Sequence, residues 1–264
     1  MVKIINADNN PINISMLEHT VNTDTVFGPM TVYKNDLFIS GALVLYGEYC
    51  AIEVFLLKNA SVKHDVVLDI GANIGFHSLG FGNCFSQVHS MEPNAMHYQM
   101  LCNNTKDKSN IKTHNVACGS STGQVFIEGF DPSQQGNFGK IFTGIGNTHV
   151  DCITIDSLDL DECDAIKIDT EGHEYECLLG ATNIIQKFNP AILFEYNTGA
   201  GDNSIQFLKE LDYLVWKFSV RNYNPKNWKN NSQNVYLNSG VTNCIAIPKK
   251  NQIESINHAG FVLC

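Results

Sequence analysis

The sequence lacks features that would each indicate a familiar class of protein. No apolar run approaches the roughly eighteen residues of a membrane span, so we expect no membrane partner. The first eight residues turn polar before an apolar signal core forms, which predicts a cytoplasmic protein. The nine cysteines are scattered and include no C-x-x-C pair, so they predict reduced thiols rather than a disulfide framework or a zinc site.

Positive charge is also scarce. The chain has 17 Lys and Arg residues against 27 Asp and Glu residues, which gives a net charge of −10. A broad phosphate-binding surface is therefore disfavoured, and we expect no nucleic-acid partner. With 264 residues, of which 44% are hydrophobic and 17% charged, the composition is that of one globular domain.

The body of the chain, residues 65–250, alternates apolar strand-like runs with amphipathic stretches. This alternation predicts an α/β fold, in which a mostly parallel, doubly wound sheet of seven strands carries helices on both faces. The last two runs are separated by an Asn-rich connection, residues 221–234, which predicts a closing hairpin with one antiparallel strand at the sheet edge. The expected strands are Val66–Ile70, Gln87–Glu92, Ile111–Ala117, Val125–Glu128, Ala165–Asp169, Ala191–Glu195, Tyr213–Val220 and Cys244–Pro248.

Two shorter segments flank this body. Residues 1–64 are expected to form an extension of the same domain, with short strands between Thr25 and Val44. The extension should then form a helix at 48–59, and residues 251–264 should form a C-terminal tail. On this helix we expect Glu48 and Tyr49 to lie over a bound cofactor, and the inward side chains to be Tyr49, Ile52, Phe55 and Leu56.

A glycine-rich loop follows the first strand of the body. The segment runs from Asp69 through Gly71, Asn73 and Gly75 into a helix, which places bare backbone and free N–H groups beside any bound carboxylate. A dinucleotide fold would need glycine at the position of Asn73, and no Lys-Ser or Lys-Thr pair follows to make a phosphate loop. A plain structural turn stays open as an alternative.

The second strand ends in an acidic residue whose spacing from the glycine loop is informative. Glu92 follows Asp69 by 23 residues, where Rossmann-like sheets place the carboxylate that accepts both hydroxyls of a ribose. An adenosine cofactor needs such an acceptor. The segment from Asn115 to Ala117 should end the third strand, where backbone or amide groups could meet an adenine edge.

A cluster of ionisable residues follows the fourth major strand. Lys167 and Asp169 point to one face, and Glu171 and His173 form the turn into the next helix. Such a group at a pocket mouth can tune pKa values for proton transfer, so these four residues are candidate catalytic residues. Helix capping by Asp169 is the simpler alternative. The D-x-E-x-H spacing matches no known metal motif, so no metal is expected.

Taken together, the segments 67–75 and 166–174 resemble the FkbM family of methyltransferases. The segments 91–94, 115–119 and 155–158 are also similar to that family. The resemblance implies a class I, Rossmann-like sheet and S-adenosylmethionine as methyl donor, with Asn94 among the cofactor-binding residues. Where the family commonly has valine, this chain has Thr170. The segment 129–147 has no clear family counterpart, and we expect it to select the acceptor.

The resulting hypothesis is methyl transfer to a hydroxyl of a sugar, a glycan or another small metabolite. Asp169 is the first candidate for orienting or deprotonating the acceptor, with Glu171 and His173 behind it and Lys167 as an electrostatic partner. Two alternatives remain: an NAD(P)-dependent oxidoreductase, or a non-catalytic interaction module that keeps the fold.

Overall fold

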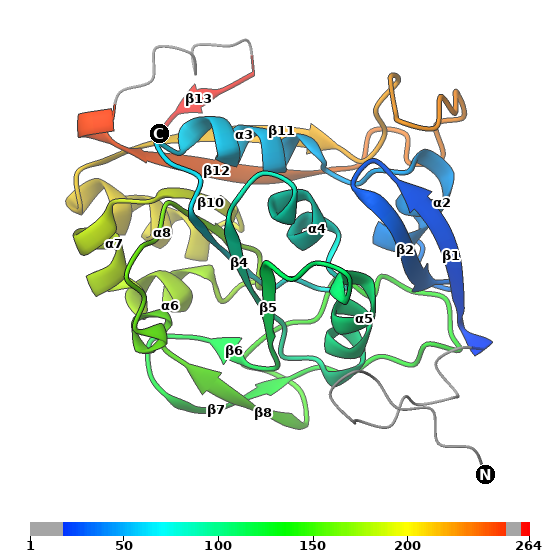
Figure 1. Ribbon diagram of the computed structural model, residues 1–264, viewed down its shortest axis with the longest axis horizontal. Coiled ribbons are helices and arrows are strands. Elements are labelled where there is room, and N and C mark those ends of the chain that lie inside the picture. Colours follow the sequence, from blue (N-terminus) through cyan, green and yellow to red (C-terminus); the bar gives the residue numbers. More distant parts are fainter. Residues whose placement is uncertain (1–17, 252–259) are drawn as a thin grey trace.

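Eight strands form the central sheet in the computed structural model, which describes residues 18–251 and 260–264. Their order across the sheet is β13-β11-β12-β10-β9-β3-β4-β5 (Figure 1). Their bounds are Val66–Ile70 (β3), Gln87–Met91 (β4), Ile111–His114 (β5), Ala165–Ile168 (β9), Ala191–Glu195 (β10), Tyr213–Arg221 (β11), Gly240–Pro248 (β12) and Val262–Leu263 (β13).

The middle of the sheet is parallel and buried on both faces. Strand β3 pairs in parallel with β4 and β9, and β9 pairs in parallel with β10. Alternate side chains separate two hydrophobic cores, so that Val67 belongs to one core and Leu68 to the other. The expected α/β fold with a mostly parallel sheet is confirmed.

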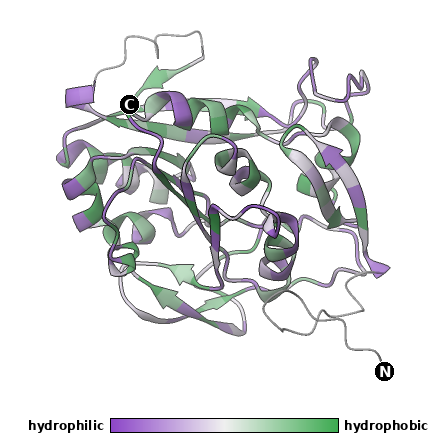
Figure 2. Cartoon of the chain, viewed as in Figure 1, coloured by the Kyte–Doolittle hydropathy of each residue, from purple (hydrophilic) through white to green (hydrophobic). Residues whose placement is uncertain are grey.

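Helices cover both faces of this sheet. Core residues of α3, α4 and α5 pack with Val67, and core residues of α6, α7 and α8 pack with Leu68. Figure 1 shows the second group of helices together on one side of the sheet, and Figure 2 shows that they carry both hydrophobic and hydrophilic residues, as a covering layer should. Their bounds are Ile52–Ala60 (α3), Phe76–Gly82 (α4), Ala95–Thr105 (α5), Glu174–Leu179 (α6), Thr182–Phe188 (α7) and Ala200–Glu210 (α8).

The antiparallel strand of the closing hairpin does not lie at the sheet edge, so that part of the prediction was wrong, and the edge strand is instead β13, which pairs antiparallel with β11. Strand β12 lies between β10 and β11 and pairs antiparallel with both. The segment 243–248 of β12 is completely buried, and such an apolar run gains more from two strand neighbours than from an edge with unpaired backbone groups. The described part of the tail, residues 260–264, supplies the short edge strand β13, where Leu263 is the register partner of Trp216.

The expected strand Val125–Glu128 does not belong to the central sheet. It lies in β7 (Gly123–Ile127), within a separate three-stranded sheet completed by β6 (Ala117–Cys118) and β8 (Thr148–Ile153). Most side chains of β7 are exposed, as suits a surface hairpin rather than a doubly covered strand. The expected strand Ile111–Ala117 is accordingly split, because β5 ends at His114 and the chain then crosses to the small sheet.

In the extension, the prediction of short strands is only partly correct. A hairpin of β1 (Thr20–Thr25) and β2 (Gly28–Tyr33) is followed by a helix, α2 (Ile39–Tyr46), where a strand was expected. The Asp36 carboxylate accepts hydrogen bonds from the backbone N–H groups of Phe38 and Ser40. Asp36 therefore leads into a helix rather than between two short strands.

The inward face of α3 also differs from the expectation. Ile52 and Phe55 are each 48% exposed, whereas Glu53, Val54 and Leu57 are buried. The helix begins at Ile52 rather than near Glu48, and its buried face carries Glu53, Val54 and Leu57 instead of the expected side chains. Among the described residues, no helix has both the length and the apolar character needed to cross a membrane.

We predict that the extension folds together with the body. Leu43 in α2 is fully buried in the core that also contains Val67, so Leu43→Ala should lower the free energy of unfolding by about 2–5 kcal/mol. Urea unfolding, followed by circular dichroism and by tryptophan fluorescence, should still show one transition. Leu237→Ala is the matched control because Leu237 is 72% exposed, and it should change stability by less than about 0.5 kcal/mol. Two separate transitions would contradict a single domain.

Candidate functional site

A cavity of about 400 Å³ lies at the carboxyl ends of β3, β9 and β10. Its lining also comes from α3 of the extension, from the segment 137–143 and from the hairpin formed by β11 and β12. Ligands of open α/β sheets bind at this edge, beyond the carboxyl ends of the strands. The segment 129–147, expected to select the acceptor, thus contributes part of the wall.

The glycine loop forms the floor of one end of the cavity. Gly71 has a φ of +79°, and a Cβ there would overlap the carbonyl oxygen of Asp169, so only glycine fits. Its N–H and that of Ala72 donate to the carbonyl of Met91, both at 2.9 Å. Asn73 also adopts a left-handed conformation, with a φ of 50°. The loop is therefore fixed by the ends of both neighbouring strands.

Glu92 completes this end of the cavity. The side chain is almost completely buried and accepts hydrogen bonds from the backbone N–H groups of Asn73 (2.9 Å) and Asn94 (2.8 Å). Burial raises the pKa of Glu92 to about 7, although the two N–H donors oppose that shift. Gly71, Asn73 and Glu92, three of the predicted cofactor residues, thus line one continuous surface.

The other predicted cofactor residues support this surface from outside the cavity. Asn94 caps α5 by accepting from the N–H groups of Met96 and His97, and the Asn115 amide donates to the carbonyl of Glu92 at 2.8 Å. Gly75, with a φ of +92°, precedes α4 and packs against Leu101, and Ala117 pairs with Cys152 in the small sheet. None of Gly75, Asn94, Asn115 and Ala117 is among the described residues that line the cavity.

A buried lysine joins the glycine loop to the turn that follows β9, residues 169–173, which we call the acidic turn. Lys167 Nζ lies 3.6 Å from Asp69 Oδ1 and 3.3 Å from Asp169 Oδ2. Burial opposes the charge of Lys167, but the two aspartates and Glu53 raise its pKa above the usual value. Asp69 is fully buried and accepts a hydrogen bond from the hydroxyl of Ser78 at 2.6 Å. Asp69 and Lys167 therefore lie beneath the cavity rather than on its surface.

Three carboxylates line the cavity at one point, two from the acidic turn after β9 and one from the end of β10. Asp169, Glu171 and Glu195 have oxygen atoms within 4.8 Å of one another, a donor set that could hold a cation. Burial and repulsion by Glu195 and Asp169 raise the pKa of Glu171 to about 9. Burial and repulsion by Asp169 raise the pKa of Glu195 to about 7. The site thus brings three acids together at one point of its wall, and their proximity disfavours the ionised forms.

Glu174 holds the acidic turn in place. Its Oε1 accepts hydrogen bonds from the backbone N–H groups of Thr170 (2.9 Å) and Gly172 (3.0 Å) and from the Thr170 hydroxyl (3.1 Å). The threonine that stands where related sequences commonly have valine therefore adds one bond to this support. His173 instead faces the small sheet near Gly119 and is not among the described cavity-lining residues.

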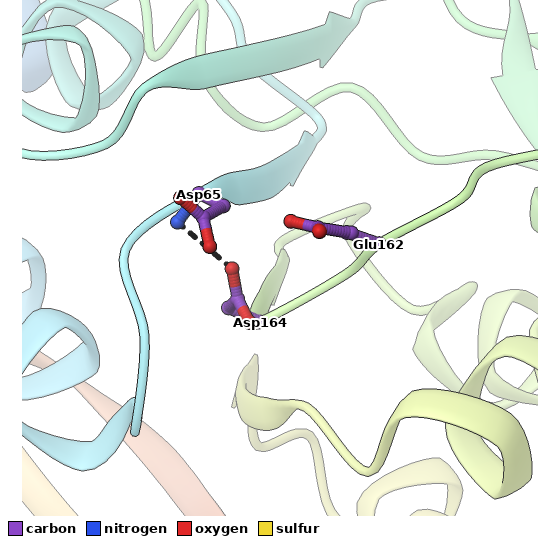
Figure 3. Close-up of side chains that lie close together, drawn as sticks. All are labelled: Asp65, Glu162 and Asp164. Carbon is purple, nitrogen blue, oxygen red and sulfur yellow. Dashed lines mark hydrogen bonds between the residues drawn. The ribbon is translucent and has the colours of Figure 1, made fainter.

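A second cluster of acidic residues lies at the opposite, amino-terminal ends of β3 and β9 (Figure 3). The Asp164 carboxylate accepts hydrogen bonds from the backbone N–H groups of Asp65 (2.8 Å) and Val66 (3.0 Å), and Glu162 lies nearby. These bonds tie the start of one strand to the start of its neighbour. This cluster therefore has a structural role that is independent of the cavity.

Several polar residues of the cavity were not predicted from the sequence, among them Glu53, His77 and Asn243. The Asn243 amide donates to Glu53 Oε1 at 2.6 Å, and His77 Nε2 lies 3.4 Å from Glu53 Oε2. Tyr49 lines the cavity as expected, but the Glu48 carboxylate accepts hydrogen bonds from the hairpin loop instead. The sequence does carry a signal for Glu53, which is a charged residue on the buried face of a helix. The signal was not recognised because the prediction placed the buried face of α3 on other residues.

Residues 69–215 match the model of the methyltransferase FkbM domain family. This range is more than half of the 264-residue chain. The chain belongs to the FkbM methyltransferase family. The resemblance noted in the sequence is thereby confirmed.

Individual proteins are also similar to this chain, which covers less than two thirds of the length of each. The hexuronic acid methyltransferase AglP of Haloferax volcanii is 28% identical over 155 residues, which cover 57% of this chain and 63% of that protein. The methyltransferase FkbM structure from Methylobacillus flagellatus has 19% identity and a TM-score of 0.46, covering 69% of this chain and 43% of that one. A Pyrococcus abyssi tRNA (uracil-54, C5)-methyltransferase in complex with S-adenosyl-L-homocysteine has 12% identity and a TM-score of 0.48, covering 87% and 44%. These structural likenesses are too low to indicate an acceptor.

The buried acid of the extension gives a prediction for pH dependence. Burial, with repulsion by Asp169, raises the pKa of Glu53 to about 8 against the attraction of Lys167. Because the folded state holds this proton more tightly than the unfolded state, stability should fall as pH rises from about 4.5 to about 8. Glu53→Gln should remove that part of the decline.

The measurement is the melting temperature at several pH values between 5 and 9. The drop across this range should be smaller in Glu53→Gln than in the wild type by roughly 4 °C. Glu162→Gln, which removes an exposed acid, should keep the wild-type slope. Equal slopes for wild type and Glu53→Gln would contradict the assignment.

Proposed function

We propose that this FkbM-family chain transfers a methyl group from S-adenosylmethionine to a hydroxyl of a sugar or another small acceptor. The observation that carries the proposal is one cavity that is lined together by the glycine loop, Glu92 and the acidic turn. Family membership supports methyl transfer as the reaction. The hexuronic acid methyltransferase of Haloferax volcanii supports a sugar as the acceptor class.

The cavity fits the cofactor by the chemistry of its donor and acceptor groups. Gly71 lines the cavity with backbone alone, and the Glu92 carboxylate can accept the hydroxyls of a ribose. Beside Glu92, His97 is buried and its Nε2 has no hydrogen-bond partner among the described residues. An unpartnered buried polar atom in a cavity wall is expected where a ligand supplies the missing bond.

The residues of the acidic turn would prepare the acceptor. S-adenosylmethionine supplies a methyl group that its sulfonium already activates, so the protein has mainly to align the acceptor and remove its proton. Asp169, fixed by Lys167, is the first candidate for this step, and Glu171 lies within reach of the same point. His173 lies outside the cavity lining and would act only through the turn.

The alternatives are less well supported. A nicotinamide-dependent oxidoreductase would need close backbone approach at Asn73, where a side chain is present in a left-handed conformation. A non-catalytic module would have no need for the lysine and the carboxylates at the cavity. The proposal also places the protein and its small acceptor in the cytoplasm. The nine unpaired cysteines support such a reducing location.

The cofactor assignment predicts a specific loss of affinity. Glu92→Ala should weaken S-adenosylmethionine binding by roughly 10–100-fold, because the ribose hydroxyls lose a buried charged acceptor. Isothermal titration calorimetry measures this directly. Glu162→Ala, far from the cavity, should bind with wild-type affinity. Unchanged affinity in Glu92→Ala would refute the ribose contact.

The catalytic assignment predicts a loss of reaction rate with little change in cofactor affinity. Asp169→Asn should lower kcat by roughly 100-fold or more, since an amide cannot take the acceptor proton. Affinity for S-adenosylmethionine should change less than about threefold, because the glycine loop and Glu92 remain. Release of S-adenosylhomocysteine gives kcat, and calorimetry gives the affinity. An active Asp169→Asn variant would move the role to another carboxylate.

A further inference from the structure

We propose that Glu53, on helix α3 of the extension, binds the α-ammonium group at the methionine end of S-adenosylmethionine. The inference rests on the proposed methyl transfer. It assigns a cofactor-binding residue outside residues 69–215, the part of the chain that matches the family model. Three observations support it: the place of Glu53 in the cavity, its hydrogen bonds, and the lack of a cationic partner among the described residues.

The cavity extends from Glu92 toward β9 and β10. Strand β3, which leads into the glycine loop, lies between β4 and β9, and Glu92 follows β4. Asp169 after β9 and Glu195 at the end of β10 line the cavity. On the other side, no described residue of β5 or of the segment 115–117 lines it. A cofactor whose ribose binds Glu92 therefore has its methionine end on the β9 side of the glycine loop.

Glu53 contributes a carboxylate to this part of the cavity. Its side chain lines the cavity although the residue is only 3% exposed. Oε1 accepts a hydrogen bond from the amide of Asn243, which is the register partner of Glu195. Oε2 lies 3.4 Å from Nε2 of His77, on α4, the helix that begins directly after the glycine loop. These two contacts hold Glu53 beside the glycine loop and the end of β10.

Glu53 has no positively charged partner at ion-pair distance within the described part of the chain. Burial and the charge of Lys167 lower the pKa of His77 to about 4, so its ring is neutral at neutral pH. Lys167 forms its ion pairs with Asp69 and Asp169. Burial raises the pKa of Glu53 to about 8, against the more distant attraction of Lys167. A buried carboxylate without a cation is expected where a ligand brings one.

The ammonium group is the cation that suits Glu53 best. It carries N–H donors, which the sulfonium lacks, and each carboxylate oxygen can accept more than one hydrogen bond. Asp169 is already paired with Lys167, and Glu171 and Glu195 lie with it at the proposed reaction centre. Glu53 is the carboxylate left to hold the methionine end.

The first experiment measures how much the amino group of the ligand contributes to binding. S-adenosylhomocysteine carries the ammonium but no sulfonium. It and an analogue without the amino group are titrated into the full chain by calorimetry. We expect the analogue to bind roughly tenfold more weakly or worse, because the buried carboxylate then lacks its charged partner. Equal affinity of the wild type for the two ligands would overturn the inference.

Two variants of Glu53 test whether its charge is the cause. Glu53→Gln keeps the shape and an oxygen for the Asn243 amide, and the preference for the amino group should fall below about threefold. Glu53→Asp, which keeps the charge, should retain part of the preference. Glu162→Gln removes an acid outside the cavity lining and should retain all of it. A purely structural role would weaken both ligands equally in Glu53→Gln, and that result would refute the assignment.

Binding should also displace the proton that burial keeps on Glu53. Near neutral pH, S-adenosylhomocysteine should release roughly one proton more from the wild type than from Glu53→Gln. Calorimetry in two buffers of different ionisation enthalpy measures this number. Equal release by the two proteins would count against Glu53. The other ionisable groups around Glu53 are the same in both proteins: Cys50, His77, Lys167, Asp169 and Glu195.

The same titrations separate failure of this inference from failure of the proposed function. A wild-type chain that binds neither S-adenosylmethionine nor S-adenosylhomocysteine would overturn the proposed function. A wild-type chain that binds both but gains nothing from the amino group would overturn only the role of Glu53.

Discussion

The site depends on a lysine buried between two aspartates at the centre of the sheet. Lys167 is 98% buried by side-chain area (2% exposed), and it reaches Asp69 on β3 and Asp169 at the end of β9. An unpaired ammonium at this depth would be very costly, so both aspartates stabilise the positive charge of Lys167. That charge in turn stabilises the two carboxylates. These contacts connect the strand that leads into the glycine loop with the strand that leads into the acidic turn. The proposed cofactor surface and the proposed reaction centre are therefore fixed relative to one another.

Negative charge crowds around this central lysine and determines the character of the cavity. Burial raises the pKa values of Glu53, Glu171 and Glu195, and repulsion among the carboxylates adds to each shift. Such crowding destabilises the folded protein above neutral pH, and it persists here where a positively charged cofactor would relieve it.

The extension and the last hairpin complete the site from opposite ends of the chain. Glu53 on α3 accepts a hydrogen bond from Asn243 on β12, and both lie near His77 on α4. The Glu48 carboxylate accepts hydrogen bonds from the hairpin loop at Asn224 and Trp228. These long-range bonds hold the extension and the hairpin together beside the ends of the parallel strands.

The sequence by itself determined the strand–loop–helix units of the body, the fold class and the family. Those features are local: the buried runs of β3 and β9, the glycines after Asp69 and the acids after Lys167 are each encoded within a few neighbouring residues. Only the tertiary structure decided that β12 lies inside the sheet, that residues 123–127 belong to a separate sheet and that Glu53 faces the cavity. Each of these depends on pairing between residues far apart in the chain, and local sequence patterns do not encode which partner a buried strand or helix face will find.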